Sequence, residues 1–381
     1  RADKRRPGLL YAGTEYGMYV SFDDGAHWKP MQLNLPIVPV TDMTIKDNSL
    51  VVATQGRAFW VLDDLGLVQQ LHADSLRSRL HVFSVDDAWR FGGGGGRRNR
   101  DRSISNAGQN PPSGVVVQYW IKDAPDTPRV SITVFDKKHE PIRTFSTHSK
   151  ETDTKLECHD GINTFVWDML YPPAVKVPGM LLWTGGAGTP MAAPGRYSVR
   201  VRYGHDSAEV PFVIKADPNF SMSEADYDAQ VGFLLQVRDK YNAVQRAVLQ
   251  IRSIRGQLQA LNGRLDSSQE PVRKLSDSVI HQLTAIEEAL YQTKSKSDED
   301  MLNYPIRIND KLSGLYGIAA GGYAVPTRQA REVFAELSTK ADTQLDRLKS
   351  IISDQLAALN KLIYERQVPV ISTKTEDEGE K

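Results

Sequence analysis

The spacing of hydrophobic and polar residues divides the chain into two parts with different periods. From Leu9 to about Val213, short apolar runs alternate with polar residues in steps of two, as in half-buried β-strands. After Pro218 the apolar residues recur in steps of three and four, as on one face of an amphipathic helix. The sequence therefore predicts a multidomain protein of β plus α class, with the sheets first and the helices after them.

The helical part begins with one long helix, whose apolar stripe runs from Tyr227 to Leu261. Ser223 with Asp226 predicts its start, because a short side-chain oxygen can cap the free N–H groups of a first turn. Stripes of this length need partners, so we expect an antiparallel helical bundle over 220–368 and a disordered charged tail over 369–381. The further helices expected are 271–294, 307–318 and one that opens at Pro326–Thr327.

Residues 1–74 contain two copies of one β-rich unit. Leu9–Thr14 matches Leu50–Gln55 at an offset of 41 residues, and the match continues without a gap to place Asp23 on Asp64. A period of about 40 to 45 residues with several short strands per copy is typical of a β-propeller blade. We therefore expect the last blades of a β-propeller here, with the other blades upstream of residue 1.

About seven short strands are expected in these two copies, fewer than two four-stranded blades contain. The expected strands are Leu9–Gly13, Met18–Phe22, Trp28–Leu33, Val40–Ile45, Leu50–Thr54, Ala58–Leu62 and, as a last strand, Leu67–Leu71.

A turn motif, Ser-x-Asp-x-Gly-x-x-Trp, lies in the first copy at Ser21, Asp23, Gly25 and Trp28. The acid can accept hydrogen bonds from turn N–H groups, the glycine permits a positive φ, and the tryptophan can cover the hairpin. We therefore assign these four residues a structural role. The motif resembles the Asp box, or BNR repeat, of sialidase-like and sortilin-like β-propellers.

The chain as a whole resembles the C-terminal part of large bacterial β-propeller proteins labelled glycosyl hydrolase or sortilin/BNR-repeat proteins. The resemblance implies an extracytoplasmic location (periplasmic, cell-surface or secreted) and a carbohydrate or protein ligand. A histidine is expected in that family where this chain has Gln55. The resemblance rests on Gly8–Glu15, Val51–Asp64, Phe165–Asp168, Pro194–Tyr197 and Tyr291–Lys296.

The middle of the chain contains a linker and a third domain. Residues 75–113 predict an extra strand and a Gly/Arg-rich linker, because five consecutive glycines lose much conformational entropy when their backbone is fixed. Residues 114–217 alternate with period two between turn clusters, which predicts an immunoglobulin-like or fibronectin-like β-sandwich. Pro172–Ala193 is long for a sandwich loop, and we expect it to dock the sandwich against the propeller or to bind a ligand through Trp183.

Composition and motifs limit the chemistry. The chain has 47 basic and 47 acidic residues, so no net charge attracts nucleic acid, and no apolar run is long enough for a membrane span. One cysteine, Cys158, excludes an internal disulfide. Cys158-His159-Asp160 predicts no catalytic triad, because adjacent strand residues point to opposite faces. We expect no metal site, no cofactor and no catalytic residue.

Three functions are compatible with these features. The first is a non-catalytic C-terminal scaffold or binding segment of a large extracytoplasmic β-propeller protein. The second is part of a sialidase-like or xyloglucanase-like glycoside hydrolase whose catalytic acids lie upstream of residue 1. The third is a sortilin-type protein- or peptide-binding module. The candidate ligand-binding residues are Arg57, Trp60 and Trp183, because planar cations and aromatic rings recognise carboxylates and sugar faces.

Overall fold

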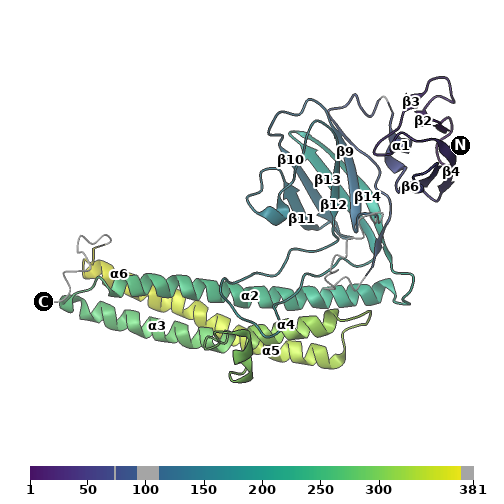
Figure 1. Cartoon of the computed structure of the whole chain (residues 1–381). Helices are drawn as coiled ribbons and strands as arrows, with labels where there is room; N and C mark the ends of the chain where they lie inside the picture. Colours follow the sequence, from purple (N-terminus) through teal and green to yellow (C-terminus); the bar gives the residue numbers. More distant parts are fainter. Residues whose placement is uncertain (73, 92–110, 370–381) are drawn as a thin grey trace. The chain divides into compact units, whose positions relative to one another are not determined.

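The computed structural model describes residues 1–72, 74–91 and 111–369 (Figure 1). It divides into two compact units, one comprising Arg1–Met169 with Pro194–Asp217 and the other Leu170–Ala193 with Pro218–Lys381. In the described part of the chain every strand lies in the first unit, and every helix of ten or more residues lies in the second. The β plus α class is therefore confirmed. Most of the expected Gly/Arg-rich linker (92–110) and nearly all of the charged tail (370–381) fall outside the described residues.

Two three-stranded antiparallel sheets come first, and they share one apolar core. The first sheet has the order β1-β2-β3 and the second the order β4-β5-β6. The core contains Leu9, Tyr11, Met18 and Val20 from the first sheet and its flank, and Met43, Ile45, Leu50 and Val52 from the second. The strands are β1 (Leu10–Thr14), β2 (Gly17–Ser21), β3 (Lys29–Pro30), β4 (Val40–Lys46), β5 (Ser49–Thr54) and β6 (Phe59–Leu62).

The strand expected at Leu67–Leu71 is wrong, because these residues belong to the short helix α1 (Gly66–Gln70). Its apolar residues Leu67, Val68 and Leu71 are spaced by one and three, which suits a helical turn and does not suit a strand that buries every second residue. Helix α1 therefore closes the second sheet's end of the shared core, where Leu65 is fully buried and Val68 packs against the same cluster.

Two larger sheets complete the first unit. One has the order β12-β9-β7 and the other the order β11-β10-β13-β14-β8, in which β8 pairs with β14 in parallel. They pack face to face, because Trp167 of β12 lies against Tyr197 of β13 and Phe212 of β14. The strands are β7 (Leu80–Val82), β8 (Ala88–Arg90), β9 (Val115–Ile121), β10 (Val130–Phe135), β11 (Pro141–Ser146), β12 (Gly161–Trp167), β13 (Gly195–Tyr203) and β14 (Asp206–Ala216); a 3₁₀ turn, Thr152–Thr154, follows β11.

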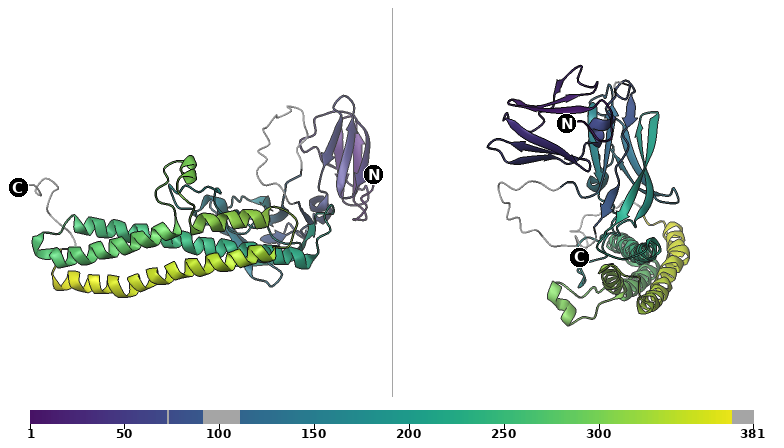
Figure 2. Two further views of the ribbon diagram at one scale, coloured as in Figure 1. Left: turned by 90° about the horizontal axis from the view of Figure 1, so that it is seen from below. Right: turned by 90° about the vertical axis from the view of Figure 1, so that its right-hand side faces the viewer.

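The second unit is built from long helices around one apolar core. Helix α2 runs antiparallel to α3, because Arg252 contacts Glu287 and Asn262 contacts Asp277. It also runs antiparallel to α4, because Gln230 contacts Ala319 and Gln245 contacts Asn309. It runs parallel to α5, because Phe233 contacts Phe334 and Lys240 contacts Asp342. Figures 1 and 2 show these helices side by side. The helices are α2 (Glu224–Asn262), α3 (Glu270–Leu290), α4 (Ile308–Ala320), α5 (Arg328–Ser350) and α6 (Leu356–Glu365), with 3₁₀ turns at Ser267–Gln269 and Asp298–Leu302 and a π-helical turn at Ile351–Gln355 between α5 and α6.

The predicted helix starts are confirmed at both ends of this unit. Ser223 caps α2 by accepting a hydrogen bond from the Asp226 amide, and the Asp226 carboxylate reciprocates with the Ser223 amide. Thr327 caps α5 by accepting a hydrogen bond from the Ala330 amide. Among the described residues, no helix combines the length and the apolar character that a membrane crossing requires.

Candidate functional site

The turn between β2 and β3 joins the motif residues in one hydrogen-bond network. The fully buried Ser21 hydroxyl donates to Asp23 Oδ1 (2.8 Å) and accepts from the Gly25 amide (2.9 Å). Asp23 Oδ1 also accepts from the His27 amide at 2.8 Å. Gly25 has φ +92°, and a Cβ added there would lie 3.8 Å from the Trp28 ring. The network holds the turn and leaves no group free for acid–base work.

The electrostatics of this turn favour the ionised acid. The His27 amide, the His27 ring nitrogen at 2.7 Å and the Ser21 hydroxyl together lower the pKa of Asp23 to about 2. A carboxyl group held ionised in this way is a poor general acid at neutral pH. Asp23 therefore acts as an acceptor for its own backbone.

In the corresponding turn after β6, the acid Asp64 has different hydrogen-bond partners. Asp64 Oδ1 accepts from the Gly66 amide (2.6 Å) and from Asn48 Nδ2 (2.9 Å), and the same Asn48 nitrogen donates to Asp86 Oδ2 (2.9 Å). Burial raises the pKa of the Asp64 carboxyl despite the Gly66 hydrogen bond, and the charge of Asp86 adds to the increase. Both carboxylates are used to fasten chain segments to one another.

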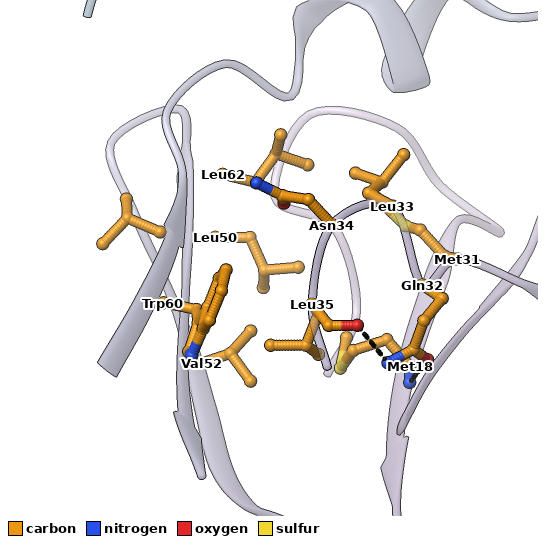
Figure 3. Close-up of a pocket in the computed structure, with 11 residues that line it drawn as sticks. Met18, Met31, Gln32, Leu33, Asn34, Leu35, Leu50, Val52, Trp60 and Leu62 are labelled. Atoms are coloured by element: carbon orange, nitrogen blue, oxygen red, sulfur yellow. Dashed lines mark hydrogen bonds between the residues drawn. The ribbon is translucent and has the colours of Figure 1, made fainter. Parts of the chain in front are cut away.

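Arg57 and Trp60 lie together, at the end of the β5–β6 hairpin. The Trp60 indole N–H donates to the Arg57 carbonyl at 3.0 Å, while the Arg57 side chain is exposed. The Trp60 ring faces the interior between the first two sheets and lines a cavity of about 60 Å³ (Figure 3). This volume holds a few water molecules and no sugar ring. The other lining residues are Met18, Met31, Gln32, Leu33, Asn34, Leu35, Leu50, Val52, Val61 and Leu62.

Trp183 belongs to the second unit, in the segment Leu170–Ala193 that connects β12 to β13. Its ring is 54% exposed, while its amide donates to Asp310 Oδ2 at 2.8 Å. The Thr184 amide and hydroxyl donate to Asp310 Oδ1 at 3.0 and 2.6 Å. The hydrogen bonds of Met180, Leu181 and Trp183 are with the helical unit, so the helices hold this loop, and its docking against the propeller stays a prediction.

Buried polar residues that the sequence reading missed hold this loop along the helices. Asn242 accepts from the Val175 amide at 2.7 Å, and Gln245 donates to Met180 Sδ at 3.3 Å. Tyr291 accepts from the Leu181 amide at 3.2 Å. Asn242 and Gln245 stand beside the apolar stripe of α2 and are almost fully buried. A polar side chain at a core-facing helix position is the sequence signal that could have revealed them, because a buried polar group needs a partner.

No catalytic triad forms at Cys158, His159 and Asp160. The Cys158 thiol points to the His159 carbonyl, and the His159 ring contacts the Asp160 carbonyl at 2.8 Å. Asp160 accepts from the Ala124 amide at 2.9 Å. Among residues 1–72, 74–91 and 111–369, no cluster of three or more His, Cys, Asp or Glu side chains could hold a metal ion.

Comparison with known proteins adds little to this picture. No family model matches the sequence, and no curated protein matches it. A solved structure, pT26-6p, is similar at 12% sequence identity over 62% of this chain and 47% of that chain, with a TM-score of 0.10. The chain thus spans about half the length of that protein, and a likeness at this TM-score carries no argument about fold or function.

Proposed function

We propose that this chain is the non-catalytic C-terminal scaffold and binding segment of a larger extracytoplasmic β-propeller protein. In this proposal residues 1–74 are terminal propeller blades, residues 114–217 an immunoglobulin-like or fibronectin-like sandwich, and residues 220–368 an antiparallel helical bundle. The extracytoplasmic location rests on the family resemblance. The way the first two sheets pack supports the propeller assignment.

In this proposal the two sheets are equivalent copies, and a similar hydrogen bond in the β1–β2 hairpin and in the β5–β6 hairpin supports the equivalence. Thr14 Oγ1 donates to the Gly17 carbonyl in the first sheet, and Thr54 Oγ1 donates to the Ala58 carbonyl in the second. Thr14 therefore corresponds to Thr54, and Gly17 corresponds to Ala58. The turn of the β5–β6 hairpin is thus longer by a single residue than the turn of the β1–β2 hairpin. This correspondence differs by a single position in β1 from the gapless match, which pairs Thr14 with Gln55, and agrees with it in β2.

Corresponding faces of the two sheets have opposite environments. In the first sheet, Met18 and Val20 of β2 are buried against the second sheet. Their equivalents in β6, Phe59 and Val61, are 76% and 52% exposed. The other face of the second sheet, which carries Trp60, turns toward the shared core.

The packing is therefore head to tail, with one face of the first sheet covering the opposite face of the second. A head-to-tail contact leaves a complementary face open on each copy and generates a ring when the rotation closes. A β-propeller is such a ring. The apolar face of Phe59 and Val61 is the surface that the next sheet of the ring would cover.

The non-catalytic assignment rests on the acids of the two turns. Asp23 and Asp64 are engaged by their own backbone amides and by neighbouring polar side chains. A propeller glycosidase needs two carboxylates about 5–9.5 Å apart across the substrate. The turn acids of this segment are committed to holding chain segments together.

The test compares this chain with the longest reading frame that contains it. Phe59→Cys is introduced into both proteins on a Cys158→Ser background and reacted with a thiol reagent, with Tyr364→Cys as control because Tyr364 is 85% exposed. We expect labelling at position 59 to be at least tenfold slower in the longer protein, and labelling at position 364 to be equal. Equal labelling at position 59, or a reading frame without further β units at the spacing of the two copies, would overturn the proposal.

A further inference from the structure

A cleft of about 580 Å³ lies on the outer side of the five-stranded sheet, where β10 begins and β11 and β13 end. Its volume is in the range of small-molecule sites, which is about 300–1,000 Å³. The cleft is distinct from the turns and from the Trp60 cavity. Its lining consists of Arg129, Val130, Ser131, Ser146, His148, Arg202, Gly204 and His205.

The floor of the cleft is a row of three polar residues on adjacent strands. Arg202 pairs with Ser131, and Ser131 pairs with Ser146, so the three side chains stand side by side about 4.8 Å apart. Their neighbours Val130 and Val201 are buried, which places the row on the face directed away from the core.

The cleft is positively charged. Arg129 and Arg202 contribute two full charges, and His148 and His205 are two further groups that carry charge when protonated. None of the described residues that line it carries a carboxylate. Within the described residues, no hydrogen bond or ion pair engages the side chains of Arg129 and Arg202, whereas Arg200 on the same strand is paired with Glu209 at 2.7 Å. Two unneutralised guanidinium groups at one opening attract an anion.

The cleft is also held in shape by its own hydrogen bonds. The Gly204 amide donates to the Arg129 carbonyl at 3.2 Å, which joins the two segments that carry the arginines. The Ser146 hydroxyl oxygen accepts from the His148 amide at 3.2 Å, so its own proton is free to donate to a ligand. The Thr147 hydroxyl lies 3.0 Å from His148 Nδ1 and fixes that ring. These bonds order the backbone, Ser146 and His148 before a ligand arrives, which lowers the ordering entropy of this part of the cleft.

We propose that this cleft binds an oxyanion group, a phosphate or sulfate ester carried by a molecule of about the size of a sugar. The planar guanidinium groups of Arg129 and Arg202 match the geometry of such oxygens and bind them with two parallel hydrogen bonds. The hydroxyls of Ser131 and Ser146 supply neutral donors between them. The proposal does not depend on the propeller assignment, because every residue involved lies in the five-stranded sheet or directly beside it.

The test is a titration of the whole chain, followed by amide NMR signals of Ser131, Ser146 and Arg202, at fixed ionic strength. The probes are inorganic phosphate, inorganic sulfate, glucose 6-phosphate, glucose 6-sulfate and, as the neutral control, glucose. The variants are Arg129→Gln and Arg202→Gln. Arg196→Gln is the matched control, because Arg196 is exposed on the same face of β13, about 20 Å along the strand from Arg202.

We expect at least one ester to bind saturably, each cleft variant to weaken it tenfold or more, and Arg196→Gln to change it less than twofold. Tighter binding of glucose 6-phosphate identifies a phosphate ester as the ligand group, and tighter binding of glucose 6-sulfate identifies a sulfate ester. The proposal is overturned if no charged probe saturates these signals, if glucose binds as well as its esters, or if Arg196→Gln weakens binding as much as the cleft variants.

Discussion

Replacing Asp310 by alanine should release the loop Leu170–Ala193 from the helical unit. Asp310 is 2% exposed, lies in the first turn of α4 and accepts three hydrogen bonds from two consecutive residues, Trp183 and Thr184. The positive end of the α4 dipole stabilises the carboxylate at this position. The substitution leaves the two amides without their acceptor and removes a charge that both helix and loop stabilise.

The expected cost follows from the number and kind of these contacts. A hydrogen bond to a charged group contributes about 1.5–3 kcal/mol, and such contributions are not additive when the bonds share one acceptor. Because the loop amides are only partly buried, water can solvate them once the carboxylate is gone. We therefore expect a loss of about 3 kcal/mol in the free energy that keeps the loop closed, which corresponds to roughly a hundredfold larger equilibrium constant for opening.

Amide hydrogen exchange of the intact chain is the assay, because it reports on the loop separately from the global unfolding of two units. The amides of Trp183 and Thr184 should exchange about a hundredfold faster in Asp310→Ala, while the strands of the first unit keep their protection. The matched control is Asp342→Asn, which removes a half-exposed ion pair with Lys240 and should cost less than about 1 kcal/mol. Unchanged loop protection in Asp310→Ala, or an equal effect of Asp342→Asn, would refute the reasoning.

Three further results are expected. The His27 amide signal should titrate with a midpoint near pH 2 and lose this titration in Asp23→Asn, because the lowered pKa of Asp23 stabilises the turn above about pH 4 and this contribution disappears as the pH falls through 2. Glu287→Gln should lower the stability of the helical unit in urea by about 3 kcal/mol, because Glu287 is 1% exposed and its loss leaves two arginine partners unpaired. Phe59→Ser should change stability by less than about 0.5 kcal/mol and reduce any self-association seen in sedimentation, because Phe59 is 76% exposed on an apolar face.

The helices could be predicted from the sequence because their signals are local. The stripe from Tyr227 to Leu261 and the caps at Ser223 and Thr327 lie within a few residues of the structure they specify, and the structure bears them out. The short segment after Gly66 carries a weaker signal: the spacing of Leu67, Val68 and Leu71 suits a helical turn, but three apolar residues are too few to define a period. Period alone therefore identifies long elements and leaves short ones undecided.

The loop and the cleft could not be predicted, because their residues are far apart in the sequence. Asp310 meets Thr184 across 126 positions, and Arg129 comes beside Arg202 only through the pairing of β10 with β13. The sequence expectation named Trp183 for its ring, whereas its backbone amide makes the contact that holds the loop.

The alignment of the two copies within 1–74 depends on a single position in the first strand. A gapless match pairs Tyr11 with Val52, which both face the shared core, but it pairs Met18, which faces the core, with Phe59, which is 76% exposed. The hairpin hydrogen bonds of Thr14 and Thr54 shift the first strand by a single position and pair Tyr11 with Val51 instead. Since successive strand residues point to opposite faces, that shift makes the first strand agree with the second: in both, the face that turns to the core in the first copy turns away from it in the second. In the proposed propeller, the apolar face of Val51 and Phe59 is the surface that a further sheet would cover.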